Sequence, residues 1–356
     1  MIKLLHAADF HLDSAFSELT SEKAVLRRRE QRLALGELVE LARGCDLMLL
    51  SGDLFDSASV YRDTVDALKE FFEAVRIPVF IAPGNHDFVT GGSPYLTEAW
   101  SENVHIFTSP TIERVHLDKL GCDVYGVGYV AAEQKPLLAD FHVADPTAIN
   151  LMVLHAALMQ GSPYAPVLPE EIAASGLDYL ALGHVHTSSV RQLGQTTYAY
   201  PGCLMGRGFD ECGQKGALTV TVDKAHCKAE FLPVSGRKYE ILTVEVGDDP
   251  LESIRSALPQ GCENDCYRII LTGESERFDL ERLQEALSSS FFSLRLDDRT
   301  LPKRSLWAAV GEDTLRGEIL KDLKAQYDEA SEAQRHKLAQ AAALLLDLMD
   351  GREVPY

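Results

Sequence analysis

Apolar residues in the first third of the chain alternate between short continuous runs and longer stretches with helical spacing. Residues 2–8, 47–50 and 78–82 are short apolar runs, which predict buried strands. Between them, residues 21–42 and 60–75 repeat apolar side chains at the spacing of an amphipathic helix. This order predicts parallel strands in one sheet, with helices packed on its faces.

Beyond residue 104 the pattern changes to short strand-like runs with few helical repeats between them. We expect strands at 115–117, 124–129, 151–154, 179–182, 189–193, 197–200, 217–222 and 229–234. Such a series suggests a second sheet packed on the first. The predicted fold class is therefore α/β, with a four-layer α/β/β/α sandwich as its main part.

A domain boundary is expected at the Ser-Gly-Arg sequence of residues 235–237. Beyond it, strand-like and helix-like runs alternate again as far as residue 296, which predicts a small α/β capping domain. The expected domains are 1–234, 236–310 and a helical tail at 311–356.

Two apolar stripes at helical spacing mark the tail, at 315–327 and 338–348. The polar stretch 328–337 separates them, and Ser331 with Gln334 could form a capping box that starts a second helix. One long helix and a helix pair both fit this pattern. Whether these apolar stripes pack on their own chain or bind a partner is also left open.

The composition adds limits on the protein class. Apolar residues make up 46% and charged residues 25% of 356, as in ordinary folded proteins, and no apolar run reaches the roughly 18 residues of a membrane span. The N-terminal residues lack a secretory signal pattern, so we expect a cytoplasmic protein with no membrane association. Seven cysteines without a Cys-x-x-Cys pair indicate reduced thiols. The net charge of −20 argues against strong non-specific binding of nucleic acid.

Residue types that bind metals follow the predicted strands. They are Asp9 and His11, Asp53 and Asp56, Asn85 with His86 and Asp87, then His155, and finally His184 and His186. When two ligands lie two residues apart at the end of a strand, their side chains point to the same side. Any one of these positions alone is more simply a turn or surface residue. Five such elements in one chain favour a pair of divalent metals, whose characteristic chemistry is phosphate-ester hydrolysis.

The ordered set resembles the calcineurin-like metallophosphoesterase superfamily. Within it, the chain is similar to SbcD-type DNA repair exonucleases, and most of all to their YhaO-like branch. The sequence stretches that carry the resemblance are 8–14 (Ala-Asp-Phe-His-Leu-Asp-Ser), 51–56, 83–87, 153–155 and 178–186, with branch-level likeness at 200–202 and 206–211.

The resemblance implies a role for each motif residue. It gives the first metal the ligands Asp9, His11, Asp53 and His186, and the second metal the ligands Asp53, Asn85, His155 and His184. The family usually works with manganese, so two Mn²⁺ ions are expected. His86 is expected to face the scissile phosphate, with Asp87 orienting it, while Asp56 supports the first metal without binding it.

Several arginines have two readings. Arg62, beside Tyr61, contacts substrate or simply opens a helix. Residues 27–29 (Arg-Arg-Arg) meet a phosphate backbone or, as the simpler interpretation, form a solvated helix face. Arg207 reaches substrate or pins its own loop.

The leading hypothesis is a manganese-dependent DNA exonuclease or endonuclease in DNA repair. The resemblance implies DNA as substrate and an SMC-like coiled-coil ATPase of the SbcC type as partner. One alternative keeps the chemistry and changes the substrate to a small nucleotide or a phosphoprotein, which the acidic balance favours. Another is a non-catalytic scaffold with a structural metal site. The sequence leaves the oligomeric state open, a homodimer included.

Overall fold

The computed structural model of the chain describes residues 1–276, 278–302 and 304–351. Contacts divide the chain into two units, Met1–Lys238 and Tyr239–Tyr356. No helix among the described residues is long and apolar enough to cross a membrane. The division of the second unit into a capping domain and a tail stays a prediction.

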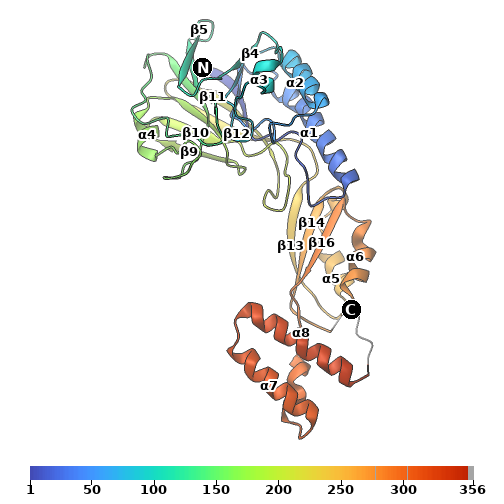
Figure 1. Cartoon of the computed structure of the whole chain (residues 1–356). Coiled ribbons are helices and arrows are strands. Elements are labelled where there is room, and N and C mark those ends of the chain that lie inside the picture. The colour runs from blue at the N-terminus through green and yellow to red at the C-terminus, as the bar shows by residue number, and fades with distance from the viewer. Residues whose placement is uncertain (277, 303, 352–356) are drawn as a thin grey trace. The chain divides into compact units, whose positions relative to one another are not determined.

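The first sheet of the first unit has six strands in the order β12-β11-β1-β2-β3-β4. Their bounds are β12 (Cys227–Pro233), β11 (Gly216–Val222), β1 (Ile2–Ala7), β2 (Leu47–Leu50), β3 (Val79–Ile81) and β4 (Val104–Ile106). The strands β1 to β4 are parallel. The helices α1 (Ser21–Leu41) and α2 (Arg62–Val75) connect β1 to β2 and β2 to β3, and both pack on the same face (Figure 1). Crossovers of the same hand between adjacent parallel strands place both helices on one face.

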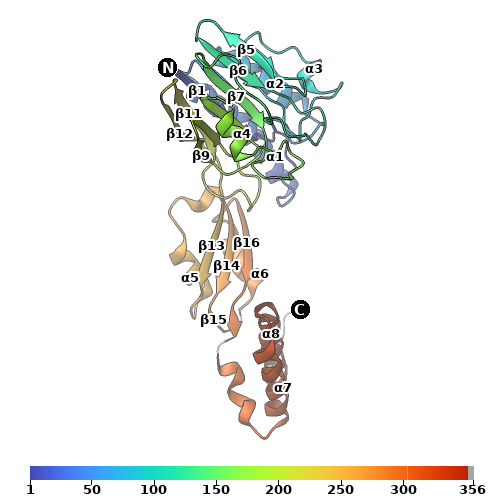
Figure 2. The same ribbon diagram turned by 90° about the vertical axis from the view of Figure 1, so that its left-hand side faces the viewer.

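The second sheet also has six strands, in the order β5-β6-β7-β8-β10-β9. Their bounds are β5 (Glu113–Leu117), β6 (Cys122–Gly126), β7 (Ile149–His155), β8 (Tyr179–Gly183), β10 (Thr196–Tyr200) and β9 (Ser189–Leu193). The central strands are buried along their whole length. The short helix α4 (Pro169–Ala174) covers the outer face through Ile172 (Figure 2). A further short helix, α3 (Pro94–Thr97), follows β3.

Three layers of apolar side chains hold these elements together. One lies between α1, α2 and the first sheet, one between the two sheets, and one outside the second sheet. Alternation along β1 explains the split, because Leu4 faces the second sheet while Leu5 and Ala7 face the helices. The predicted four-layer α/β/β/α sandwich is confirmed.

One part of the strand assignment is wrong. The runs at 217–222 and 229–234 were expected in the second sheet, but β11 and β12 extend the first sheet. Antiparallel pairing joins β11 to β1 from Ile2 with Val222 to His6 with Leu218. Side chains of β11 face the core between the two sheets, so an apolar run fits either sheet equally well and the sequence cannot distinguish them.

The second unit begins with a three-stranded parallel sheet in the order β13-β14-β16. Its elements are β13 (Tyr239–Glu245), α5 (Pro250–Ala257), the turn η1 (Cys262–Asn264), β14 (Cys266–Thr272), α6 (Leu280–Ser288) and β16 (Ser293–Asp298). Both helices pack on the same face of the sheet (Figure 1), with Ile254 and Leu283 in a shared core. The two-residue strands β15 (Glu274–Ser275) and β17 (Leu301–Pro302) pair beside it.

The tail forms a helix pair rather than one long helix. After η2 (Arg304–Gly311) come α7 (Leu315–Glu329) and α8 (Glu332–Met349). Gln334 accepts hydrogen bonds from the backbone N–H and the hydroxyl of Ser331, at 3.1 and 2.8 Å, which starts α8 where the sequence suggested. Leu320 and Ala342 are buried in a core of their own between these elements.

Candidate metal centre

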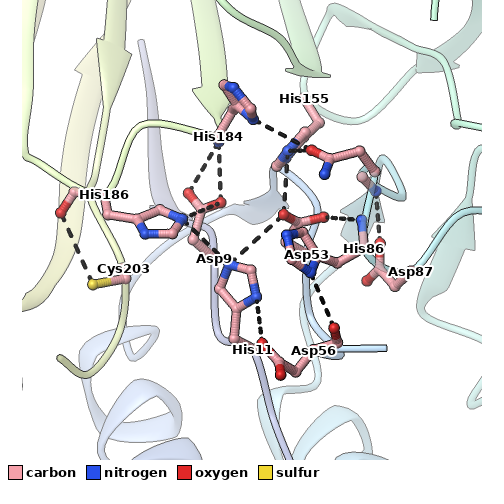
Figure 3. Close-up of polar contacts among 12 residues, drawn as sticks. Asp9, His11, Asp53, Asp56, His86, Asp87, His155, His184, His186 and Cys203 are labelled. Atoms are coloured by element: carbon pink, nitrogen blue, oxygen red, sulfur yellow. Dashed lines mark hydrogen bonds and ion pairs between the residues drawn. The ribbon is translucent and has the colours of Figure 1, made fainter. Parts of the chain in front are cut away.

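The predicted metal ligands converge at the carboxyl ends of parallel strands from both sheets. In chain order they are Asp9 and His11 after β1, Asp53 after β2, Asn85 after β3, His155 at the end of β7, and His184 and His186 after β8. Figure 3 shows the labelled aspartates and histidines of this set gathered around a common centre. The carboxyl edge is where open α/β sheets bind their ligands.

One group consists of Asp9, His11 and His186, whose candidate ligand atoms lie within 4.8 Å of one another. Nε2 of His11 is 3.2 Å from Nε2 of His186, and the latter is 3.6 Å from Oδ1 of Asp9. Two neighbouring ligands are about 3.0–3.4 Å apart when each bond to a shared cation is about 2.1 Å long. The two imidazole nitrogens therefore have the separation of ligands on one cation.

Asp53 lies between this group and a second one. Its Oδ2 is 3.7 Å from Nε2 of His11 and 3.4 Å from Nε2 of His155. Oδ1 of Asn85 is 3.0 Å from Nε2 of His155 and 3.3 Å from Nδ1 of His184. A carboxylate within reach of both groups is what a bridging ligand of two cations requires.

The backbone at this edge is strained. Asp9, His11, Asp53 and His184 have φ values of 52°, 43°, 51° and 100°. Such values cost on the order of 1–3 kcal/mol each for residues other than glycine and gather at functional sites. Backbone hydrogen bonds hold the strained loops side by side, from Asp9 N to Gly52 O at 3.0 Å and from His11 N to Asp53 O at 2.9 Å.

Two glycines allow close approaches at this edge, Gly183 between the two sheets and Gly84 between the loops after β2 and β3. A Cβ at Gly183 would overlap the carbonyl oxygen of Ser51 and come within 3.0 Å of Nδ1 of His155. A Cβ at Gly84 would overlap the carboxylate of Asp53. Glycine is therefore required at both positions by close approach.

Hydrogen bonds fix which ring nitrogen of two histidines faces the centre. Nδ1 of His155 lies 2.9 Å from the carbonyl oxygen of Ser51, which can only accept, so this nitrogen carries the proton. Nδ1 of His186 lies 2.6 Å from Oε1 of Glu211. In both rings Nε2 is left to bind a cation, the usual arrangement around metal-binding histidines.

Burial and neighbouring charges shift the pKa values at this site in opposite directions. Burial opposes ionisation of His186, but the nearby carboxylates of Asp9 and Glu211 raise its pKa to about 9. Burial and the nearby His155 lower the pKa of His184 to about 4. The pKa of Asp9 lies below its usual value despite burial, because His186 and the other histidines stabilise the carboxylate.

His86 occupies an exposed position at the edge of the same centre. Its backbone N–H donates to Oδ1 of Asp53 at 2.9 Å, and Nδ1 of its ring lies 3.0 Å from the carbonyl oxygen of Asp56. A ring nitrogen of His86 also lies within 4.8 Å of ligand atoms of His11 and Asp53. The position fits a residue that faces substrate, and the geometry alone also permits ligation.

Asp87 does not orient the ring of His86 directly, contrary to the sequence-based expectation. Its buried carboxylate accepts hydrogen bonds from the backbone N–H groups of Leu54 and Gly84, both at 2.7 Å, and from the hydroxyl of Tyr95 at 2.5 Å. Burial and the charge of Asp53 raise its pKa. Asp87 thus ties together the loops after β2 and β3, while the carbonyl of Asp56 holds the ring.

Both Arg62 and Arg207 form ion pairs within the protein. Arg62 opens α2 and pairs on the surface with Asp66 at 3.0 Å and Glu98 at 3.1 Å. Arg207 forms ion pairs with Asp56 and with Glu211 of its own loop.

For Arg27 the expected solvated helix face is wrong. Its side chain is fully buried, and it donates to the carbonyl oxygen of Gly206 at 2.8 Å. Arg29, two positions on, is exposed.

Sequence reasoning gave no role to two residues that support this centre. One is Glu211, for which no local pattern signals contact with His186. The other is Gln31 of α1, whose amide donates to the carbonyl oxygens of Phe10 and His11 at 3.2 and 2.9 Å. A signal for Gln31 was present, since it is a polar residue on the helical face that carries Leu35.

The donor set fits divalent metals. Carboxylate and amide oxygens combined with imidazole nitrogens suit ions such as manganese, iron and zinc better than calcium, which prefers oxygen alone. Buried carboxylates packed against one another and against histidines also need compensating positive charge. The residues present are therefore compatible with two divalent cations that share Asp53.

Comparison with known proteins assigns the class. A family model described as calcineurin-like phosphoesterase matches residues 2–188, which is more than half of the chain. The chain belongs to the calcineurin-like phosphoesterase family and is a metal-dependent hydrolase. The likeness to SbcD-type and YhaO-like proteins is also confirmed by its relatives.

Three relatives align over most of their length. The uncharacterized metallophosphoesterase YhaO of Bacillus subtilis (strain 168) is 30% identical, over 84% of this chain and 82% of its own. A DNA double-strand break repair protein Mre11 of Saccharolobus solfataricus is 24% identical, over 96% and 94%. A subunit of the nuclease SbcCD of Bacillus subtilis (strain 168) is 21% identical, over 79% and 82%.

Proposed function

We propose that this chain is a two-metal phosphodiesterase that cleaves DNA, as a manganese-dependent exonuclease or endonuclease in DNA repair. The observation that carries the proposal is the gathering of seven ligand side chains from five strand ends around Asp53. The names of two relatives refer to double-strand break repair and to a nuclease, which supports DNA as the substrate.

The proposed ligands form two sets that share one residue. Asp9, His11, Asp53 and His186 would hold one cation, and Asp53, Asn85, His155 and His184 would hold the other. When bound, two such cations would supply positive charge at the phosphate and lower the pKa of a bound water molecule.

The protein's own residues would position the reacting groups. Asp53 fixes the spacing of the two ligand sets, because its carboxylate reaches both. With Nδ1 of His86 held by the carbonyl of Asp56 at 3.0 Å, Nε2 can face the phosphate and, when protonated, donate to the leaving oxygen. Asp56 lies 3.1 Å from Nδ1 of His11 and would keep that ring in place.

A partner protein is part of the proposal. One relative is named as a subunit of the nuclease SbcCD, so we propose that this chain works with an SMC-like coiled-coil ATPase of the SbcC type. The helix pair α7 and α8 is the candidate docking segment, because Leu315, Leu344 and Leu348 are exposed on it.

The net charge of −20 favours a second candidate, hydrolysis of a small nucleotide by the same centre. A polyanionic substrate would meet long-range repulsion that a small one largely avoids. The extra second unit favours DNA instead, since a small substrate does not need it.

The experiment that tests the proposal uses the purified chain, Mn²⁺ and end-labelled linear DNA, single-stranded and double-stranded, alongside a cyclic dinucleotide. We expect progressive shortening of DNA, and its loss in Asp53→Asn. Turnover of the cyclic dinucleotide with intact DNA would favour the second candidate. Full DNA cleavage by Asp53→Asn would contradict the two-metal scheme.

A further inference from the structure

The loop that follows β10 reaches back to the metal centre through two charged residues. Glu211 is 4% exposed, and its Oε1 lies 2.6 Å from Nδ1 of His186. Arg207 donates to the same carboxylate from its backbone N–H at 2.8 Å and from Nη2 at 2.6 Å. Glu211 is therefore held on two sides, by an imidazole and by a guanidinium.

The same guanidinium reaches a second carboxylate. Nη1 of Arg207 donates to Oδ1 of Asp56 at 2.9 Å, and this oxygen lies 3.1 Å from Nδ1 of His11. One planar side chain thus spans the two carboxylates that face the Nδ1 atoms of His186 and His11. The Nε2 atoms of these rings are the pair separated by 3.2 Å.

This geometry has a direct consequence for ligation. A carboxylate hydrogen-bonded to Nδ1, as Glu211 is to His186, keeps the proton on that nitrogen, orients the ring and makes Nε2 a better donor to a metal. At His11 the carboxylate of Asp56 lies at ion-pair distance from Nδ1 and acts on the ring through its charge. Arginine presents several N–H groups in a fixed plane, so it can hold two carboxylates at a set separation. Lysine carries one point charge on a flexible stem and cannot reproduce that spacing.

The loop itself is anchored from α1. Arg27, fully buried, donates to the carbonyl oxygen of Gly206 at 2.8 Å and pairs with Glu30 at 2.6 Å. The second oxygen of Glu30 accepts from Arg237 at 2.7 Å. Since an uncompensated buried charge is costly, these contacts fix Gly206, and with it the start of the Arg207 side chain.

We propose that Arg207 and Glu211 are positioning residues that set the orientation of His186 and His11 for the first cation, an inference that rests on the proposed metal site. Arg207 acts through two carboxylates rather than on substrate. Its Nε, Nη1 and Nη2 all donate within the protein, and a substrate phosphate would have to displace one of these contacts.

The test compares Arg207→Lys and Glu211→Gln with the unaltered chain by calorimetric titration with Mn²⁺ alone. We expect the unaltered chain to bind two ions, and both variants to bind one of them about 10- to 100-fold more weakly while the other is unchanged. Arg268→Lys is the matched control, because Arg268 pairs with Asp297 in the second unit. That variant should bind Mn²⁺ as the unaltered chain does.

Kinetics with an aryl phosphodiester separate positioning from substrate binding. For Arg207→Lys we expect activity to recover at high Mn²⁺ with an unchanged KM. Unchanged Mn²⁺ affinity together with a raised KM at saturating Mn²⁺ would overturn the inference and make Arg207 a substrate contact. An unaltered chain that binds no Mn²⁺ would instead contradict the metal site itself. Circular dichroism confirms that each variant is folded.

Discussion

At the scale of single residues, the candidate centre keeps conformations that a stable fold would otherwise avoid. Asp9, His11, Asp53 and His184 all have positive φ values. Hydrogen bonds to neighbouring residues hold this backbone conformation. The N–H of His184, for example, donates to the carboxylate of Asp9 at 3.0 Å. A strained backbone that is held in this way keeps the ligand atoms in a fixed arrangement before a cation binds.

Substituting His86→Ala separates its catalytic role from ligation. Its contact with Asp53 is made by the backbone N–H, which alanine retains. We expect Mn²⁺ affinity within about threefold of the unaltered chain, and phosphodiesterase activity lower by about 10² to 10⁴, the usual contribution of a general acid. Calorimetry and steady-state kinetics measure the two quantities. A large fall in Mn²⁺ affinity would make His86 a ligand instead.

His6 gives the protein a pH-dependent stability that is independent of the centre's own histidines. It is fully buried between the sheets, with hydrogen bonds to Tyr179 at 2.8 Å and Ser51 at 2.9 Å, and burial lowers its pKa from 6.5 to about 3. Below pH 6.5 the unfolded chain gains a proton that the folded chain does not. The folded state therefore loses about 1.4 kcal/mol per pH unit down to about pH 3.

Urea unfolding of the unaltered chain and of His6→Gln at pH 6.5 and 5.0 measures the contribution of His6 to the free energy of unfolding. Other titrating groups cancel in the difference between the two proteins. We expect the difference in free energy of unfolding between the unaltered chain and His6→Gln to fall by about 2 kcal/mol from pH 6.5 to pH 5.0. A difference that stays constant with pH would show that His6 does not titrate in this way.

At the scale of elements, α1 both covers the first sheet and supports the metal loops. Leu35 and Leu38 pack in the core, whereas Arg27 and Gln31 on the same face bond to loop carbonyl groups. Polar residues within an apolar stripe are costly to bury unless they are hydrogen-bonded. Their presence here indicates that the helix is adapted to the centre as well as to the core.

Replacing Gln31 by leucine tests this support. The carbonyl oxygens of Phe10 and His11 would lose their amide donor. We expect the free energy of unfolding to fall by about 1–3 kcal/mol and Mn²⁺ to bind at least tenfold more weakly. Leu33→Gln, at an exposed position of the same helix, is the control and should change neither quantity by much. Unaltered Mn²⁺ binding in Gln31→Leu would show that α1 does not support the metal-binding loops.

Local patterns predicted most elements because each apolar run or stripe is a property of its own segment. Helix α5 at Pro250–Ala257 and strand β9 at Ser189–Leu193 were found with their full bounds. The pairing of β11 with β1 was not, because it joins segments some 200 residues apart. The ligand types could likewise be named from strand ends. The contact of Glu211 with His186 could not, because it joins two separate loops and no local pattern signals it.

At the scale of the whole molecule, the described helices of the tail share a core with η2, which precedes them. Leu320 and Ala342 are buried with η2, α7 and α8, apart from the core that contains Ile254. A separate core lets a segment be removed with limited effect on the others. The centre in the first unit should therefore not depend on α7 and α8.

Ending the chain at Gly311 tests the tail as the proposed partner segment. We expect the shortened protein to keep its hydrolysis of an aryl phosphodiester within about twofold, and to lose binding to an ATPase of the SbcC type. Gel filtration of the mixed proteins and steady-state kinetics give the two readings. Unchanged co-elution with the ATPase would place the docking surface elsewhere.

The two-cation site around Asp53 is tested most directly by a crystal of the protein grown with excess Mn²⁺ and measured at the manganese absorption edge. We expect two anomalous peaks on either side of the Asp53 carboxylate, one beside Nε2 of His11 and His186 and one beside Nε2 of His155. A structure with no peak there, or with peaks bound only by other residues, would contradict the two-cation site.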